Sequence, residues 1–279
     1  MPVGKENTTH RHDLHTIEYA HVTQRFFGEE GLKGTGVSLS KEFAPIGFYQ
    51  ELVVTAVDAF GGGHGHEDEE EPEPEPDEPA NKDIDGLGYS ARFRNYWDLS
   101  QAANIELSFS GVTGKRAQPL TETIFPPVEV PRAINARQSV AGIDLTYRWR
   151  PLQQGLFRSF LVRTEVMRQF NERDPDLGDL DAGYAYAGPT RDFDGAYVFA
   201  RYQLARRWFL GARADWLEDP EADGETLRAG SGYLQFYPSE FSKLVAGFEH
   251  LRPGGGEDRI NRLILQATFA LGPHKPHPF

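Results

Sequence analysis

Apolar and polar residues alternate along several short segments of this chain, and no other feature limits its fold as strongly. Residues 143–149 carry apolar side chains at odd positions and polar or charged ones at even positions. The same two-residue period returns in residues 210–216 and 263–271. Successive side chains of a β-strand point to opposite sides, so each segment predicts a strand with one apolar face. Strands of this kind build either a soluble sandwich or a membrane barrel.

The lengths of the connections favour the barrel. We predict eleven strands, at residues 35–43, 48–60, 87–97, 103–112, 139–150, 158–170, 194–204, 208–217, 227–237, 242–251 and 259–271. Short turns alternate with longer polar connections, the longest being 61–86, 113–138 and 171–193. A transmembrane barrel has tight periplasmic turns and long outer loops, whereas a sandwich has no reason to alternate. The chain is therefore predicted to be all-β, an antiparallel up-and-down transmembrane β-barrel.

The tryptophans agree with this interpretation. On this assignment all four project with the apolar set, and three of them lie beside short turns. Tryptophan is favoured at membrane interfaces, because its ring is apolar and its N–H can stay hydrated. A sandwich core, the alternative, would place them in mid-strand. The predicted membrane-interface belt consists of Trp97, Trp149, Trp208 and Trp216.

Strand parity also predicts how much of a barrel this chain contains. If the short turns are periplasmic, the first strand begins outside the cell and the last ends in the periplasm. The predicted strand count of eleven is therefore odd, whereas a closed barrel has an even number of strands. Residues 1–20 lack the basic start and apolar core of an export signal. We therefore expect an incomplete barrel, with at least one strand and a signal sequence upstream of Met1. Within this chain we expect an extracellular-loop-like segment (1–34), the barrel (35–272) and a periplasmic tail (273–279).

One acidic segment offers the sequence's candidate metal site. Residues 67–85 contain eleven carboxylates and one lysine, so the loop 61–86 is predicted to be disordered. At its start, GGGHGHEDEEE combines two imidazoles with adjacent carboxylates, a ligand set that suits Zn²⁺. The candidate ligands are His64, His66, Glu67 and Asp68. The alternative is a solvated acidic loop that attracts cations diffusely, and no other cofactor is expected.

The polar faces of the predicted strands collect seven arginines and five carboxylates. Arginine is always charged and binds phosphate or carboxylate as a fork, so arginines along a pore favour anions. The alternative is that these charges pair across neighbouring strands and fill the lumen. The predicted pore-lining residues are Arg92, Arg94, Glu106, Asp144, Arg148, Arg150, Arg163, Glu165, Arg201, Arg213, Asp215 and Glu249.

Several segments carry a resemblance to a known family. They are RFFGEEGL (25–32), FRNYWDLS (93–100), GIDLTYRWRP (142–151), YQLARRWFLGAR (202–213), YPSEFSKL (237–244) and LQATFALGPHKPHPF (265–279). Together they resemble bacterial outer-membrane β-barrel proteins described as porin-like or as zinc-regulated or TonB-dependent outer-membrane receptors. The resemblance implies the outer membrane of a Gram-negative bacterium, contact with its lipid, and recognition of the carboxyl-terminal strand by the barrel-assembly machinery. We find no amino-terminal plug domain of a TonB-dependent receptor in the sequence.

Transport of small solutes or ions is the predicted function. No catalytic motif is present, and His250 is the only strand histidine close to a predicted loop, so an enzyme is not expected. Nucleic-acid binding is disfavoured, because the chain has an acidic loop and lacks a contiguous basic patch. The alternative function is a non-conducting structural or adhesion barrel that acts through its long outer loops.

Overall fold

Antiparallel strands make up most of the structure. The computed structural model describes residues 1–28, 31–58, 87–124, 128–171, 184–186, 192–218, 225–254 and 258–269. Its strands are β1 (Gly36–Phe43), β2 (Tyr49–Val57), β3 (Gly88–Ser100), β4 (Ala103–Ile124), β5 (Val128–Trp149), β6 (Phe160–Asn171), β7 (Tyr184–Tyr186), β8 (Phe193–Ala205), β9 (Trp208–Glu218), β10 (Thr226–Ser239), β11 (Ser242–Arg252) and β12 (Ile260–Phe269). The helices of these ranges are all too short and too polar to cross a membrane.

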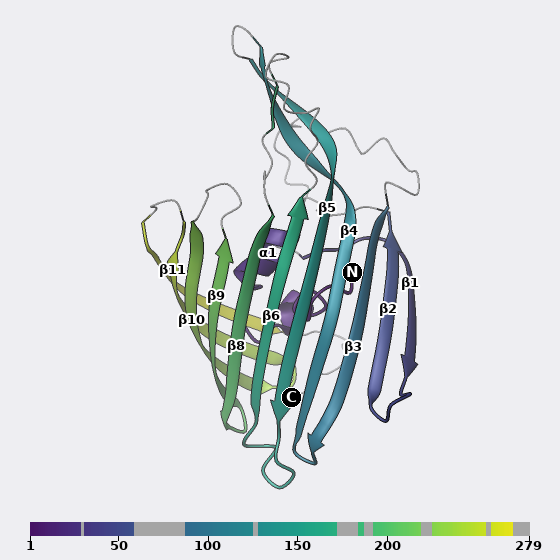
Figure 1. The fold of residues 1–279 in the computed structure, drawn as a ribbon. Coiled ribbons are helices and arrows are strands. Elements are labelled where there is room, and N and C mark those ends of the chain that lie inside the picture. Colours follow the sequence, from purple (N-terminus) through teal and green to yellow (C-terminus); the bar gives the residue numbers. More distant parts are fainter. Residues whose placement is uncertain are drawn as a thin grey trace.

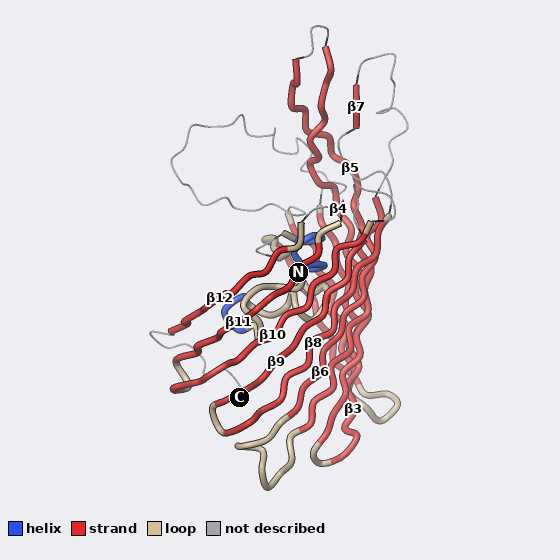
Figure 2. The backbone as a smooth tube through the Cα atoms, turned by 90° about the vertical axis from the view of Figure 1, so that its left-hand side faces the viewer, coloured by secondary structure: helices blue, strands red, loops and turns tan. Residues whose placement is uncertain are grey.

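The strands form one up-and-down sheet. Its order is β1-β2-β3-β4-β5-β6-β8-β9-β10-β11-β12, and every neighbouring pair is antiparallel. Figures 1 and 2 show a sheet that curves around a concave face. Within the described residues β1 and β12 do not pair, so the sheet there is open. The eleven main strands confirm the predicted all-β, antiparallel, up-and-down fold.

The two-residue turns all lie at one end of the sheet, and most of the longer connections leave from the other end. The turns after β3, β8 and β10 have two residues each and lie at the lower end in Figure 1. The prediction of a long loop at 113–138 is wrong, because β4 and β5 continue to pair as far as Ile124 and Val128. Pro119 and Pro131 lie in the part of this hairpin that extends beyond the residues of β4 and β5 paired with β3 and β6. The short strand β7 also lies in a predicted loop and pairs with β4.

The two faces of the sheet differ as the alternation predicts. Along β9 the side chains of Phe209, Arg213 and Asp215 are buried on the concave side, whereas Leu210 on the other side is 51% exposed. The outward face displays large apolar side chains on most strands, among them Phe109, Ile143, Val166, Val198, Leu210, Leu234, Phe248, Leu263 and Leu265. This outward apolar surface is the reverse of a soluble protein, whose apolar residues are mostly inside.

The amino-terminal segment, residues 1–28 and 31–34, fills part of the concave face. It contains a 3-10 helix, η1 (Arg11–Asp13), and one short α-helix, α1 (His21–Phe27). Figure 1 shows it in purple within the curve of the sheet. Val22 and Phe26 of α1 are buried, and Phe26 contacts Phe193 of β8 edge to face, with ring centroids 5.1 Å apart. The sequence predicted only a loop-like segment here and gave no indication that it packs against the sheet.

Candidate functional site

The concave face carries the charged side chains that the sequence assigned to a pore wall. Those buried on it are Arg92, Glu106, Asp144, Arg163, Glu165, Arg213, Asp215 and Glu249, while Arg94, Arg148 and Arg201 are half-buried. Arg150 follows the end of β5 and is exposed, and its Nε donates to the carbonyl oxygen of Gly155 at 2.9 Å. The structure thus brings these residues to one side of the sheet. Their role in lining a pore stays a prediction.

Many of these charges pair with one another, as the alternative interpretation expected. The guanidinium of Arg92 lies 3.0 Å from the carboxylate of Asp144, and that of Arg213 lies 2.8 Å from Asp215. The carboxylate of Glu249 accepts a hydrogen bond from the guanidinium of Arg262, on the neighbouring strand β12, at 2.6 Å. Charge pairs of this kind order the wall and reduce the number of cations that a solute could reach.

The amino-terminal segment is bound to this wall through polar contacts. Lys5 Nζ lies 2.7 Å from Glu106 Oε1, and the backbone N–H of Gly4 donates to Ser110 Oγ at 3.0 Å. The N–H of His21 donates to Asp215 at 3.0 Å. Burial lowers the pKa of Lys5, and the contact with Glu106 opposes that shift. A carboxylate wall therefore holds the segment along its length.

Glu6 is the central buried carboxylate of the segment. Its Oε2 accepts the N–H of Ala20 at 2.7 Å and the hydroxyl of Thr23 at 2.9 Å, and its own N–H donates to Glu165 at 2.6 Å. Burial raises the pKa of Glu6, while nearby Arg213 opposes the shift. Glu6 thus fixes the fold of the segment and joins it to β6.

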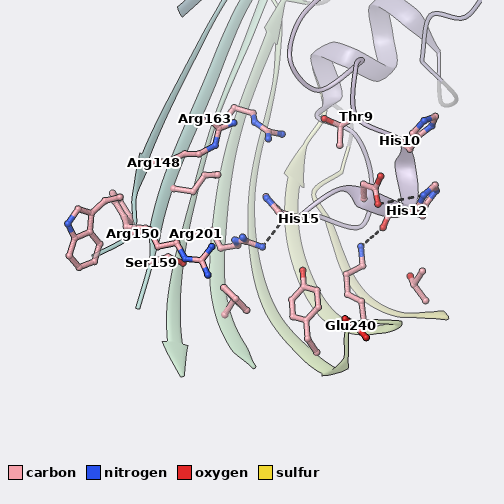
Figure 3. A pocket seen from close by; sticks show the side chains of 18 of the residues that line it. Thr9, His10, His12, His15, Arg148, Arg150, Ser159, Arg163, Arg201 and Glu240 are labelled. Atoms are coloured by element: carbon pink, nitrogen blue, oxygen red, sulfur yellow. Dashed lines mark hydrogen bonds and ion pairs between the residues drawn. The ribbon is translucent and has the colours of Figure 1, made fainter. Parts of the chain in front are cut away.

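A cavity of about 550 Å³ lies between the turn of residues 8–15 and the sheet, near the end with the short turns (Figure 3). Its charged lining consists of Arg148, Arg150, Arg163, Arg201, Lys243, Asp13 and Glu240. Three imidazoles (His10, His12 and His15) and three phenylalanines (Phe160, Phe209 and Phe241) also line it. Four arginines and one lysine therefore face two carboxylates, and the cavity is a basic chamber with apolar surface beside it.

The pairing register explains why three arginines border one part of this wall. Leu161 of β6 pairs with Arg148 of β5 on one side and with Arg201 of β8 on the other. These two arginines are two strand spacings apart, about 10 Å between Cα atoms. Arg163 lies two residues further along β6, on the same face. Three adjacent strands thus direct guanidinium groups towards the same space.

His15 enters this group of cations from the amino-terminal segment. Arg201 donates to its Nδ1 at 2.8 Å, and Gln235 donates to its carbonyl oxygen. Because arginine cannot accept a hydrogen bond, Nδ1 is unprotonated and the imidazole is neutral. Burial lowers the pKa of His15 well below its usual range, and the positive charges of Arg201, Arg163, Lys243 and Arg148 lower it further.

The four tryptophans lie on the outward face. Trp97, Trp149 and Trp208 are near the short turns, and Trp216 is near the other end of β9. None of them belongs to the buried core of the described residues, and Trp208 stacks on Phe236 with ring centroids 4.4 Å apart. Their assignment to a membrane-interface belt stays a prediction.

The candidate metal ligands His64, His66, Glu67 and Asp68 lie outside the described residues, as do the tail 273–279 and the whole acidic loop 61–86. In the part of the chain that is described, no three His, Cys, Asp or Glu side chains are grouped to hold a metal ion. His250 points outward, and its Nδ1 lies 2.8 Å from Asn261 Oδ1.

Comparisons with known proteins agree with this architecture. No protein-family model matches the sequence. A stretch of 170 residues, 54% of this chain, is 28% identical to an uncharacterized protein of Aquifex aeolicus (strain VF5), and the match covers 33% of that protein. The structure is similar to that of the outer-membrane expressed OmpT of Vibrio cholerae, with a TM-score of 0.52 over 94% of this chain and 74% of that one.

The chain has a porin-like barrel fold. The sequence identity to OmpT is 9%, so the similarity establishes the fold and gives no solute. It confirms the predicted likeness to outer-membrane β-barrel proteins at the level of the fold. Zinc regulation and coupling to TonB find no support in it.

The sequence did not indicate several residues of the cavity and of the contact between the amino-terminal segment and the sheet. Lys5, Glu6 and His15 belong to a segment without regular periodicity, and their partners on the sheet are about 100 or more residues away in the chain. Lys243 alternates with apolar neighbours in β11, so strand parity could have assigned it to the inner wall. The histidines of residues 10–15 were visible as a cluster, but their position inside the sheet depends on tertiary packing.

Proposed function

We propose that this protein is a porin-like transport protein of the bacterial outer membrane that passes or captures small solutes or ions. The observation that carries the proposal is the contrast between the two faces of the sheet. The outward face is apolar, as contact with lipid requires, and the concave face is charged and borders a cavity. Outer-membrane lipid and the barrel-assembly machinery are the partners that this function implies.

In this proposal the amino-terminal segment narrows the lumen. A barrel with a wide interior leaves a water path, and an internal segment restricts it. The segment contacts the wall through buried apolar side chains such as Val22 and Phe26 as well as through charged and polar groups, and open space remains beside it at the cavity. Solutes would pass or be held between the segment and strands β5 to β11.

A second function has a specific observation in its favour. The hairpin of β4 and β5, together with β7, projects beyond the end of the main sheet (Figure 1). A projecting hairpin offers a surface for contact with another molecule, and an internal segment that fills the lumen would prevent conduction. This is the structural or adhesion barrel, which does not conduct.

Conductance of the full-length protein in planar bilayers separates the two. We expect discrete conductance steps, because a transport barrel contains a water path. The chain has no native cysteine, so Thr9→Cys, at the cavity, creates a single reactive thiol. A bulky thiol reagent should reduce the conductance of this variant by at least half. Leu204→Cys, on the outward face, is the control and should be unaffected. A complete lack of conductance contradicts transport and favours the structural barrel.

A further inference from the structure

Arg163 has an unusual environment for a buried cation. The residue is 7% exposed, it lines the cavity, and its Nε is buried without a hydrogen-bond partner among the described residues. No carboxylate in that part of the chain forms an ion pair with its guanidinium, and Glu6 and Glu165 act on it only through longer-range electrostatics. A buried charge without a paired opposite charge is costly, so such groups commonly serve to bind a ligand.

Two other cations of the cavity bind only neutral partners. Arg201 donates to His15 and Gln235 and lies over the ring of Phe209, 4.5 Å from its centroid. Lys243 Nζ donates to the carbonyl oxygens of His12 and Leu14 at 2.8 and 2.9 Å. Neutral acceptors position these cations without cancelling their charge. Arg163 and Arg201 therefore retain positive charge that a bound anion could offset, whereas Arg148 lies 3.6 Å from Glu106 and Lys243 lies near Asp13.

We propose that this cavity binds a small phosphate-bearing solute, with the phosphate held by Arg163, Arg201 and Arg148. This inference rests on the transport function proposed above and names the class of solute. Guanidinium forks match the geometry of phosphate oxygens and can bind them in pairs, so three arginines from adjacent strands suit a phosphate dianion. Figure 3 shows the three arginines and His15 around the same space.

The remaining lining indicates the rest of the solute. A volume of about 550 Å³ exceeds what an inorganic anion fills, and Phe209 and Phe241 supply apolar surface next to the arginines. An organic phosphate with a small apolar or aromatic group therefore fits better than phosphate alone. The site lies near the short-turn end of the sheet, which corresponds to the periplasmic side.

Equilibrium binding to the full-length protein in lipid-free detergent tests the proposal. The probes are phenyl phosphate, inorganic phosphate and benzoate. The binding of each is measured by titration calorimetry at constant ionic strength. We expect saturable binding of both phosphates, with phenyl phosphate the tighter, and binding of benzoate at least tenfold weaker than that of phenyl phosphate. Arg163→Gln should weaken the binding of phenyl phosphate at least tenfold.

Arg168→Gln is the matched control, because Arg168 lies on the same strand but points outward, where it pairs with Asp194. Circular dichroism and heat-modifiability on gels check that each variant has folded, and Arg201→Gln repeats the test if Arg163→Gln does not fold. The proposal is overturned if neither phosphate binds saturably, if benzoate binds as tightly, or if Arg163→Gln binds like Arg168→Gln. Binding seen only with phospholipid or lipopolysaccharide present also overturns it.

Failure of this proposal and failure of the transport function give different results. A protein that conducts but does not bind phenyl phosphate loses only the solute assignment. A protein that binds phenyl phosphate but does not conduct keeps the site and loses the transport function.

Discussion

At the scale of single residues, charged groups set how the amino-terminal segment holds to the sheet. His15 is neutral among Arg201, Arg163, Lys243 and Arg148, and burial lowers its pKa well below the usual range. When the segment leaves the wall, the pKa of His15 should return to about 6.5. Below that pH the released state binds a proton that the docked state does not, so acid should favour release.

This linkage predicts a pH dependence that one variant removes. Below about pH 6.5, docking of the segment should lose up to roughly 1.4 kcal/mol per pH unit through His15. Glu6 acts in the opposite direction, because its raised pKa makes the docked state bind a proton more readily. The difference between the wild type and His15→Gln isolates the contribution of His15. The stability of docking is measured in both proteins by hydrogen exchange of residues 1–28 at pH 7.5 and 5.5, corrected for intrinsic exchange rates.

The control is His10→Gln, because His10 is exposed. This variant should lose protection at low pH to the same extent as the wild type. If His15→Gln loses protection at low pH to the same extent as the wild type, His15 does not control docking.

At the scale of secondary-structure elements, α1 depends on close approach to the sheet. A Cβ atom at Gly195 of β8 would lie 2.5 Å from Val22 Cγ2 and 2.8 Å from Leu217 Cδ1. Gly195→Ala should therefore displace α1 and weaken docking of the segment by roughly 1–3 kcal/mol, the usual cost of overpacking. Hydrogen exchange of α1 measures the effect, while protection of β8 should persist.

Gly232→Ala is the matched control, because a Cβ at this outward-facing glycine of β10 meets no atom within 4 Å. Equal loss of α1 protection in the two variants contradicts the packing of α1 that we describe.

The strands were far easier to predict than the segment inside them. A two-residue period is local, so the main strand of residues 208–217 was placed within one residue of β9. The extension of β4 and β5 was missed because its prolines and polar residues imitate a loop. The position of α1 could not be predicted, because seven residues give little periodicity and its contacts come from β8 and β9.

At the scale of the whole molecule, strand parity predicted which charges face inward but not which remain unpaired. Arg92 and Arg163 both lie on the concave face and are similarly buried. Arg92 nevertheless pairs with Asp144, whereas Arg163 has no such partner among the described residues. The difference depends on cross-strand register and on where the amino-terminal segment lies, and neither is encoded in a single strand. The wall could therefore be predicted from the sequence, whereas the cavity within it could not.

We expect the apolar face of this sheet to contact lipid, and quenching of the native tryptophans tests this expectation. The full-length protein is reconstituted into vesicles whose lipids carry bromine either near the headgroups or near the bilayer centre. All four tryptophans share the strand parity of the outward apolar side chains and lie near strand ends, so we expect strong quenching that is greater for the shallow bromines. Fluorescence unchanged by bromine at both depths would contradict a membrane-spanning barrel and indicate that these side chains lie in a protein core or in water.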